Sequence, residues 1–374
     1  MKVLLRTAFT LLLTAHALHA GAQAPSKAPI LIGQTYVQTG PVAGLSKDPN
    51  AGIRALLTAV NASGGVKGRQ LELRQADDGF DASRAAENVK SFAEAGAVAI
   101  LMPIGTTSSE GALQAAGNLK IPLVGPYTGA NSVAKFTEFG FPVRISFDEE
   151  YGRIVNHLYT VGLTRIAFVH NENPGARAAM EATRRAIEKR GQSMLGSAAL
   201  QQDGSDAAAQ AKAIAALKPN AIVLAVTNQV ASKFIPAYRA MGAEGRFYSF
   251  SFLNGTALHK TIGADAAGVV VSQVVPNPWN AGLPLIAEYQ AAMKKIGEPQ
   301  LSYGSLEGYI SAKILVEALK RAGDTPTPAT VKRALESFKE INLGGVHVRY
   351  APNDHAGLSF SELSMIKPDG SYAR

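Results

Sequence analysis

The sequence predicts an α/β protein with two doubly wound, Rossmann-like lobes, between which the chain crosses three times. From Pro29 onward, short apolar runs rich in β-branched residues alternate with longer segments of helical period. This alternation is typical of parallel strands covered by helices on both faces. It stops near residue 146 and then begins again. A length of 374 residues, of which 47% are apolar, is enough for two domains with a sizeable core.

The first lobe is predicted from a clear change of period. Residues 30–37 form an apolar run, and the apolar side chains of residues 50–60 recur on one helical face. Glycines at 64, 65 and 68 then break the chain. The next expected elements are a strand at 70–77, a helix capped by Asp81 and ending at Ala95, a buried strand at 98–104, a helix ending at Leu119 and a strand ending at Val124.

The second lobe is expected to begin after an extended piece at residues 141–147. Asp148, Glu149 and Glu150 follow it and are suited to capping a helix that runs through Tyr159. The alternation then predicts strands at 165–170, 221–226, 247–252 and 268–275, helices at 176–189 and 231–241, and later helices at 285–295 and 306–321.

Three prolines mark the second crossing, and a third crossing is expected near Gly344 to Leu358. The prolines are Pro276, Pro278 and Pro284, and they interrupt the pattern where helices resume. The crossings assign residues 25–146 and 277–350 to the first lobe, and residues 147–276 and 351–374 to the second lobe.

Residues 1–24 are typical of a cleavable secretory signal peptide. Lys2 and Arg6 flank the start of an apolar run from Val3 to Leu18, and Ala22-Gln23-Ala24 supplies the small residues of a signal-peptidase site. The run is too short and too often interrupted by polar residues to span a bilayer comfortably. We therefore expect an exported, soluble protein.

The charge and the lack of cysteine exclude several classes of function. The formal net charge of +8 falls to +6 without Lys2 and Arg6. The basic residues are scattered, whereas nucleic-acid-binding proteins cluster Lys and Arg with aromatic residues, so we expect no nucleic-acid partner. The chain has no cysteine, which excludes disulfides, thiol catalysis and cysteine-based metal sites.

Two polar loops follow neighbouring strands of the first lobe at their carboxyl ends, where open α/β sheets bind ligands. The first loop, Gly105-Thr106-Thr107-Ser108-Ser109, offers hydroxyl groups and free backbone N–H groups at the start of a helix. Such an arrangement favours a small anion, for example a carboxylate. The second loop runs from Pro126 to Asn131, where Tyr127 offers a flat apolar wall and Gly129 allows close approach of the backbone. Helix capping by Ser and Thr is the alternative explanation of each loop.

No arrangement of residues indicates catalysis, a cofactor or a metal site. Ser132 and Lys135 have a Ser-x-x-Lys spacing, but the partner motifs of β-lactamases are missing. His170 is expected to be structural, and capping explains Asp81 better than a cation site formed with Asp77 and Asp78 does. We therefore predict a protein that is not an enzyme, with no catalytic residues, no metal and no cofactor.

Several short motifs, in this order and spacing, resemble the leucine/isoleucine/valine-binding family of type I periplasmic solute-binding proteins, which feed ABC importers. The motifs are Ile32-Gly33-Gln34, residues 39–43, residues 60–69, Asp77-Asp78, Thr106 to Ser109, residues 121–126 and residues 303–308. The resemblance implies a periplasmic monomer whose two lobes close on a small carboxylate-bearing ligand. It also implies a membrane permease of an ABC transporter as the partner.

The resemblance places the ligand-binding residues on both lobes. Thr106 corresponds to a hydroxyl that binds the ligand carboxylate, in a loop that also holds Thr107 and Ser108. Tyr127, Thr128 and Gly129 belong to a segment that contacts the ligand carboxylate and ammonium. Other ligand-binding positions of the family are occupied in this chain by Leu45, by Thr227 and Asn228, by Pro174 and Gly175, and by Ser251. His170 and Phe252 are also expected to line the cleft.

The difference from the family with the largest consequence is at position 251. The family has a carboxylate there that pairs with the ligand ammonium, whereas this chain has Ser251. A buried ammonium without a carboxylate costs several kcal/mol of desolvation. The ligand is therefore an amino acid held by another acid, such as Glu149, Glu172 or Glu307, or an ammonium-free organic or aromatic acid. The alternative function is a ligand-sensing subunit of a periplasmic receptor or regulatory system.

Overall fold

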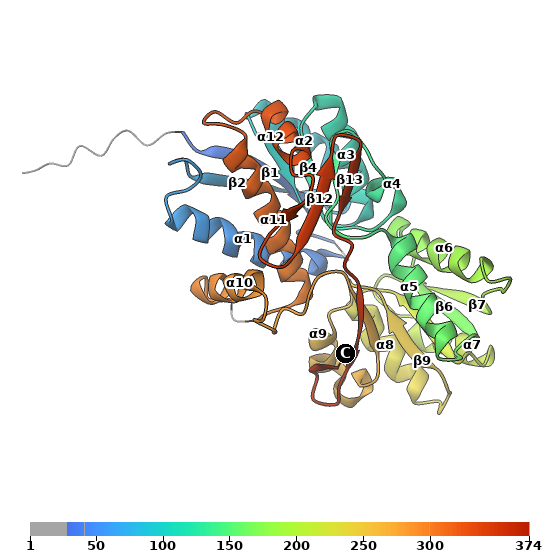
Figure 1. Ribbon diagram of the computed structural model, residues 1–374. Helices are drawn as coiled ribbons and strands as arrows, with labels where there is room; N and C mark the ends of the chain where they lie inside the picture. The colour runs from blue at the N-terminus through green and yellow to red at the C-terminus, as the bar shows by residue number, and fades with distance from the viewer. Residues whose placement is uncertain (1–27, 41, 299, 374) are drawn as a thin grey trace, which may run out of the picture.

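The computed structural model describes residues 28–40, 42–298 and 300–373, and it has two lobes (Figure 1). The predicted signal peptide lies outside the described residues. The first lobe is built on a parallel five-stranded sheet in the order β2-β1-β3-β4-β5. Its strands are β1 (Ile30–Tyr36), β2 (Leu71–Asp77), β3 (Ala99–Leu101), β4 (Leu123–Val124) and β5 (Gly140–Phe141).

Helices cover the first sheet on both faces. They are η1 (Ala43–Ser46), α1 (Lys47–Ala62), α2 (Ala82–Glu94), α3 (Thr106–Leu119), α4 (Asn131–Ala134), α10 (Pro284–Lys295), α11 (Tyr303–Arg321) and α12 (Pro328–Glu336). The closest packing joins α1 to α11, where a Cβ atom at Gly52 would overlap the carbonyl of Ser305. This contact ties the start of the chain to a helix that the chain forms only after its second crossing.

The second lobe is built on a seven-stranded sheet in the order β15-β14-β10-β9-β8-β6-β7. The strands β6 (Ile166–Asn171), β7 (Gly196–Leu200), β8 (Ala221–Ala225), β9 (Arg246–Ser249) and β10 (Val270–Gln273) are parallel, whereas β14 (Glu362–Ile366) and β15 (Tyr372–Ala373) add antiparallel strands. The helices are α5 (Phe147–Thr160), α6 (Pro174–Glu188), α7 (Ala207–Ala216), α8 (Asn228–Arg239), α9 (Gly255–Ile262) and η2 (Gly263–Ala266).

The predicted fold class is confirmed, and two local expectations need correction. The helix α2 is capped by Asp81 as expected, but α5 is capped by Ser146, which forms a capping box with Glu149, and the acidic residues occupy its first turn. The strand β7 and the helix α7 were not predicted, because both are rich in alanine and carry little period. None of the helices formed by the described residues is long and apolar enough to cross a membrane.

The third crossing lies later than the predicted boundary after residue 350. A three-stranded sheet is formed by β11 (Ile341–Asn342), β12 (His347–Ala351) and β13 (Asp354–Gly357). The turn at Pro352 and Asn353 returns the chain onto β12, so β13 stays beside the first lobe. The chain then reaches β14 in the second lobe, and Figure 1 shows this red segment running from one lobe to the other. The boundary therefore falls between residues 357 and 362.

Candidate functional site

A cleft between the lobes contains two neighbouring chambers. The larger one, which we call the outer chamber, has a volume of about 590 Å³ and is lined by residues of both lobes. The smaller one, the inner chamber, has a volume of about 60 Å³. Val42, Leu45, Thr227 and Phe252 line both chambers. The outer chamber alone lies in the size range of pockets that bind small molecules.

The inner chamber is narrow and uncharged. It is lined by Val42, Leu45, Phe80, Gly105, Thr106, Thr128, Phe147, Asn171, Asn173, Gly175, Ala176, Ala225, Val226, Thr227, Phe250 and Phe252, so no charged side chain among the described residues reaches it. Its volume holds a group of a few atoms, comparable to two water molecules at roughly 30 Å³ each. Aromatic rings form much of its wall, and hydroxyl and amide groups supply its polarity.

Two buried hydroxyl groups give the inner chamber its hydrogen-bonding capacity. The Oγ1 atoms of Thr106 and Thr128 lie 2.8 Å apart, and Thr128 Oγ1 also accepts from the N–H of Ala130 at 3.1 Å. Whichever threonine donates in this pair, the proton of the other hydroxyl is left for an acceptor in the chamber.

The N-terminus of α3 adds to this capacity because it has no side-chain cap. Gly105 is the N-cap residue, with φ of 80°, and a Cβ atom there would lie 2.6 Å from the ring of Phe80. Glycine therefore fits a left-handed position that also places backbone at the chamber wall. Uncapped N–H groups and the helix dipole both favour a negative group at this end of α3.

The structure brings six of the predicted site residues to the cleft. Thr106 and Thr128 line the inner chamber and Leu45 lines both chambers, whereas Tyr127, Asn228 and Ser251 line the outer chamber. Phe252 lines both chambers as expected, but His170 is buried outside them, with its Nδ1 3.0 Å from the carbonyl of Asn171.

Thr107, Ser108 and Gly129 line neither chamber. The Ser108 hydroxyl donates to Asp78 at 2.7 Å, and Thr35 donates to the other oxygen of the same carboxylate at 2.7 Å. Burial raises the pKa of Asp78, and these two hydroxyl groups partly offset the increase. Gly129 packs against the ring of Phe147, which a Cβ atom at Gly129 would approach within 2.6 Å. The places of Ser108 and Gly129 are therefore explained by packing within the protein.

Arg144, in the first crossing, is buried directly behind the wall of the cleft. Its Nε and Nη2 atoms donate to the two carboxylate oxygens of Glu307 at 2.8 and 2.6 Å, and Nη1 donates to Ser251 Oγ at 3.1 Å. The guanidinium carbon lies 4.8 Å from the ring centroid of Tyr127 and 4.1 Å from that of Phe252. A cation is thus held between two of the aromatic rings that line the cleft.

Glu150 completes a buried charged cluster, the name we use for Arg144, Glu150, Ser251 and Glu307. Its Oε1 accepts from the backbone N–H of Ser251 at 2.8 Å. Burial raises the pKa of Glu150, while Arg144 and hydrogen bonds from Ser251 partly offset the increase. The Ser251 hydroxyl accepts from Arg144 and interacts with Glu150, so the cluster itself uses this hydroxyl.

The three glutamates that could replace a carboxylate at position 251 lie outside the two chambers. Glu149 accepts from Ser146 in the capping box at 3.0 Å, Glu172 is exposed and pairs with Arg177 at 2.9 Å, and Glu307 pairs with Arg144. None of the three glutamates lines either chamber. Asp48 and Glu298 are the acidic side chains among the described residues that line the outer chamber.

Contacts across the cleft hold the lobes close together. Asn254, the N-cap residue of α9, donates to Asp48 of α1 at 2.7 Å, and its backbone exchanges hydrogen bonds with the Asn228 side chain. On the other side of the inner chamber, Gly175 approaches Thr106 so closely that a Cβ atom on Gly175 would lie 2.6 Å from Thr106 Oγ1. These contacts join the two lobes across the cleft.

Sequence analysis missed Arg144, Asn254, Trp279, Tyr303 and Tyr372, all of which line the cleft or lie directly behind it. Arg144 and Asn254 carry no motif that separates them from surface residues. Trp279 is the single tryptophan of the chain, and this was the one signal that could have drawn attention to it. Among the described residues, no group of three or more His, Cys, Asp or Glu side chains is placed to hold a metal ion.

A family model described as "Periplasmic binding protein" matches residues 29–366, a range that includes both lobes and the three crossings. The chain belongs to the periplasmic binding protein family. Members of this family bind ligands and are not enzymes, so the two chambers are the candidate solute-binding site of this periplasmic binding protein. No curated protein shows a significant match to the sequence.

Solved structures similar to this periplasmic binding protein extend over nearly the whole chain. An extracellular ligand-binding receptor from Verminephrobacter eiseniae is 27% identical, with a TM-score of 0.85, and the match covers 92% of this chain and 100% of that one. A substrate-binding periplasmic protein from Ralstonia solanacearum is 29% identical, with a TM-score of 0.85 and coverage of 92% and 99%. A possible leucine/isoleucine/valine-binding protein from Rhodopirellula baltica is 27% identical, with a TM-score of 0.86 and coverage of 93% and 97%.

Proposed function

We propose that this protein is the substrate-binding component of an ABC importer and that it captures a small carboxylate-bearing solute by closure of its lobes. The observation that carries the proposal is the inner chamber, where a free hydroxyl proton of the Thr106–Thr128 pair and the uncapped N-terminus of α3 meet. These groups donate hydrogen bonds, and no charged side chain of the described residues competes for them. A carboxylate fits this donor set in size and in charge.

Binding makes and breaks no covalent bond in this proposal. The solute first contacts one lobe of the open protein, and residues of the other lobe then add contacts that exist only in the closed form. A ligand shifts such an equilibrium only by its difference in affinity for the two forms. The contacts of Asn254 with Asp48 and of Gly175 with Thr106 belong to the closed form, which a membrane permease would recognise.

The proposal also covers the compartment of the protein, its oligomeric state and the class of its solute. Residues 1–24 act as a signal peptide that directs export to the periplasm, and the exported protein acts as a monomer. The solute is of the branched-chain amino acid type or a related organic or aromatic acid.

A thermal-shift panel tests the proposed function. The mature protein is unfolded and refolded to remove bound solute and is then heated with aliphatic amino acids, ammonium-free aliphatic acids and aromatic carboxylates. At a ligand concentration of 100 times the dissociation constant, binding adds about 2.7 kcal/mol to the free energy of unfolding, which raises the melting temperature measurably. No stabilisation by any carboxylate would contradict the proposal.

The variant Thr106→Val tests the placement of the carboxylate. Loss of a hydrogen bond to a charged group costs about 1.5–3 kcal/mol, so we expect the affinity for the carboxylate to fall roughly 10- to 150-fold in calorimetry. Thr261→Val, at a threonine of α9 that lines neither chamber, is the matched control and should bind normally. Unchanged carboxylate affinity in Thr106→Val would show that the carboxylate binds elsewhere.

A further inference from the structure

Trp279 is an exposed aromatic side chain inside the cleft. It lies in the second crossing, between β10 and α10, and it is 39% exposed. The described residues include seven large apolar side chains with comparable exposure, namely Leu119, Phe136, Val161, Leu195, Met241, Trp279 and Met365. Of these seven, only Trp279 lines a chamber. Exposed apolar surface that is gathered in a concave site indicates a ligand surface.

Two tyrosines extend Trp279 into an aromatic wall of the outer chamber, by which we mean Trp279, Tyr303 and Tyr372. The rings of Trp279 and Tyr372 are stacked with centroids 5.5 Å apart, and Tyr303 stands edge-on to both, also at 5.5 Å. Tyr303 belongs to α11 of the first lobe and Tyr372 to β15 of the second lobe. The wall is therefore complete only when the lobes are close together.

The aromatic wall is anchored on the side away from the chamber. The Tyr372 hydroxyl accepts from the N–H of Gly255 at 2.8 Å, which fixes this ring to the start of α9. A ligand ring can add to the existing stack in the offset or edge-to-face geometry that aromatic pairs favour. Because the wall is already ordered, little side-chain entropy is lost when a ring binds to it.

The charges around the cleft select against an ammonium group in the inner chamber. No acidic side chain of the described residues lines that chamber, and the Arg144 charge behind the ring of Phe252 is balanced by its ion pair with Glu307. In the outer chamber, Glu298 is paired with Arg54 at 2.9 Å and Asp48 accepts from Asn254, which leaves Lys47 as the remaining charged lining residue. An ammonium group would meet Asp48 alone as a partly engaged counter-ion.

We propose that the solute is an ammonium-free aromatic carboxylate whose ring lies against the aromatic wall of Trp279, Tyr303 and Tyr372. The inference rests on the proposed function, since the carboxylate is held in the inner chamber. The outer chamber, at about 590 Å³, is far larger than a four-carbon side chain requires, and a ring fills more of it. Trp279 is then the residue that determines the preference for a ring.

Matched ligand pairs test the ring and the ammonium separately. The probes are 3-phenylpropanoate and phenylalanine, which differ in the ammonium group, and 4-methylpentanoate and leucine, which repeat that difference without a ring. Calorimetry gives each dissociation constant, and the fluorescence of Trp279, the single tryptophan, reports contact with the wall. We expect 3-phenylpropanoate to bind at least tenfold more tightly than each of the other three and to change the fluorescence.

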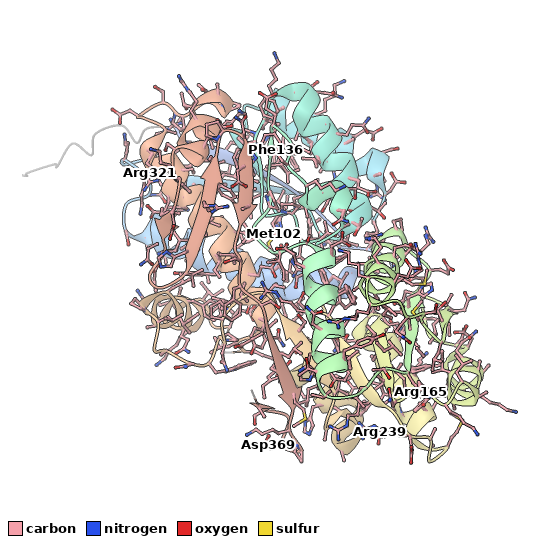
Figure 2. The ribbon with its side chains drawn as sticks, turned by 45° about the vertical axis from the view of Figure 1, so that its right-hand side comes forward. Met102, Phe136, Arg165, Arg239, Arg321 and Asp369 are labelled. Carbon is pink, nitrogen blue, oxygen red and sulfur yellow. The ribbon has the colours of Figure 1, made fainter. Side chains whose placement is uncertain are left out.

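Variants of the wall complete the test. Trp279→Leu should weaken 3-phenylpropanoate binding about tenfold and leave 4-methylpentanoate within threefold, whereas Trp279→Phe keeps a ring and should keep the preference. Phe136→Leu, at an exposed ring of the first lobe that lines neither chamber (Figure 2), should bind all four probes as the unaltered protein does. Melting temperatures without ligand verify that each variant is folded.

The outcomes separate this inference from the proposed function. Tighter binding of 4-methylpentanoate, or equal weakening of both acids in Trp279→Leu, overturns the aromatic wall as the determinant and leaves the proposed function intact. Tighter binding of phenylalanine than of 3-phenylpropanoate overturns the exclusion of the ammonium. Failure of every carboxylate to bind overturns the proposed function and this inference together.

Discussion

The inner and outer chambers of one cleft differ in the chemistry of their walls. The inner chamber is small and uncharged, and its paired threonine hydroxyl groups come from the two polar loops of the first lobe. The outer chamber is about ten times larger, contains charged side chains, and takes its aromatic wall from the second crossing, α11 and the C-terminal strand. One end of the cleft is therefore suited to a small anionic group, and the other end is suited to a larger part of a ligand.

Arg144 lies behind the boundary between the chambers, and its replacement should have the largest effect on the free energy of unfolding. Arg144→Ala leaves Glu307 buried without its cation, and breaking a buried ion pair in this way costs about 3–5 kcal/mol. We expect the free energy of unfolding in urea to fall by that amount. We also expect Phe252, which lines both chambers, and Tyr127, which lines the outer one, to lose the cation that they pack against.

The control for Arg144→Ala is an exposed ion pair in the second lobe. Arg177 pairs with Glu172 at 2.9 Å, and both side chains are about half exposed. Surface pairs of this kind contribute little, so Arg177→Ala should unfold almost as the unaltered protein does. Equal stability losses in the two variants would show that the buried charged cluster has no special role in joining the chambers.

Gly175→Ala changes the inner chamber and leaves the outer one unaltered. It should have the next largest effect, which is on ligand binding. The added Cβ meets Thr106 Oγ1 at 2.6 Å across the lobes, while alanine itself favours the helix α6. Overpacking costs about 1–3 kcal/mol, so we expect roughly 5- to 150-fold weaker ligand binding in calorimetry without a lower melting temperature of the ligand-free protein. Unchanged affinity would show that the lobes need not approach this closely around the ligand.

The sequence predicted the inner chamber better than the outer one for a physical reason. Its donors follow strands β3 and β4, and the carboxyl ends of neighbouring parallel strands meet at one edge of a sheet. Thr106 and Thr128 could therefore be placed together from local pattern alone. The aromatic wall joins residues from a crossing, a helix and the last strand, and no local period shows that such segments meet.

The buried charged cluster was beyond sequence analysis for the same reason. Arg144 and Glu307 are 163 residues apart, and single charged residues in an extended segment and on a helix normally indicate exposure. The lobes themselves were predictable because strand and helix periods repeat along the chain. The exceptions include the stretch with β7 and α7, whose small residues carry no period, and the short helices α9 and α12.

A smaller effect is expected at the outer chamber, where Asn254 bonds Asp48 across the lobes. Asn254→Asp keeps an N-cap oxygen for α9 and places a carboxylate against that of Asp48. We expect about 1 kcal/mol of repulsion at low salt, seen as roughly fivefold weaker ligand binding that recovers as salt is added.

The swapped double variant Asp48→Asn with Asn254→Asp is the control for this repulsion. It restores one amide and one carboxylate in the same positions, so the affinity should return to within twofold of the original. If the double variant binds as weakly as Asn254→Asp alone, the contact does not join the lobes in the ligand-bound form, and the outer chamber closes by other means.

The last expected effect is a change in the pH dependence of stability caused by Glu150. Burial raises the pKa of Glu150 above its ordinary value of 4.5, so between these two values the folded protein binds more protons than the unfolded chain does. The free energy of unfolding then falls as the pH rises through this window, by at most about 1.4 kcal/mol per pH unit for one group. Glu150→Gln should flatten this part of the curve in urea titrations from pH 4.5 upward.

The difference between the two titration curves isolates Glu150, because other buried acids such as Asp78 contribute equally to both proteins. Arg144, Ser251, Ser272 and Tyr151 interact with Glu150 and do not titrate in this range, so the change of slope in Glu150→Gln reports the loss of this carboxyl from the cluster. Parallel curves would show that Glu150 stays ionised and that the cluster behind the wall has a net negative charge. An ammonium group on the ligand would then be attracted to that wall, and the chambers would differ less in the charge they accept than their lining residues indicate.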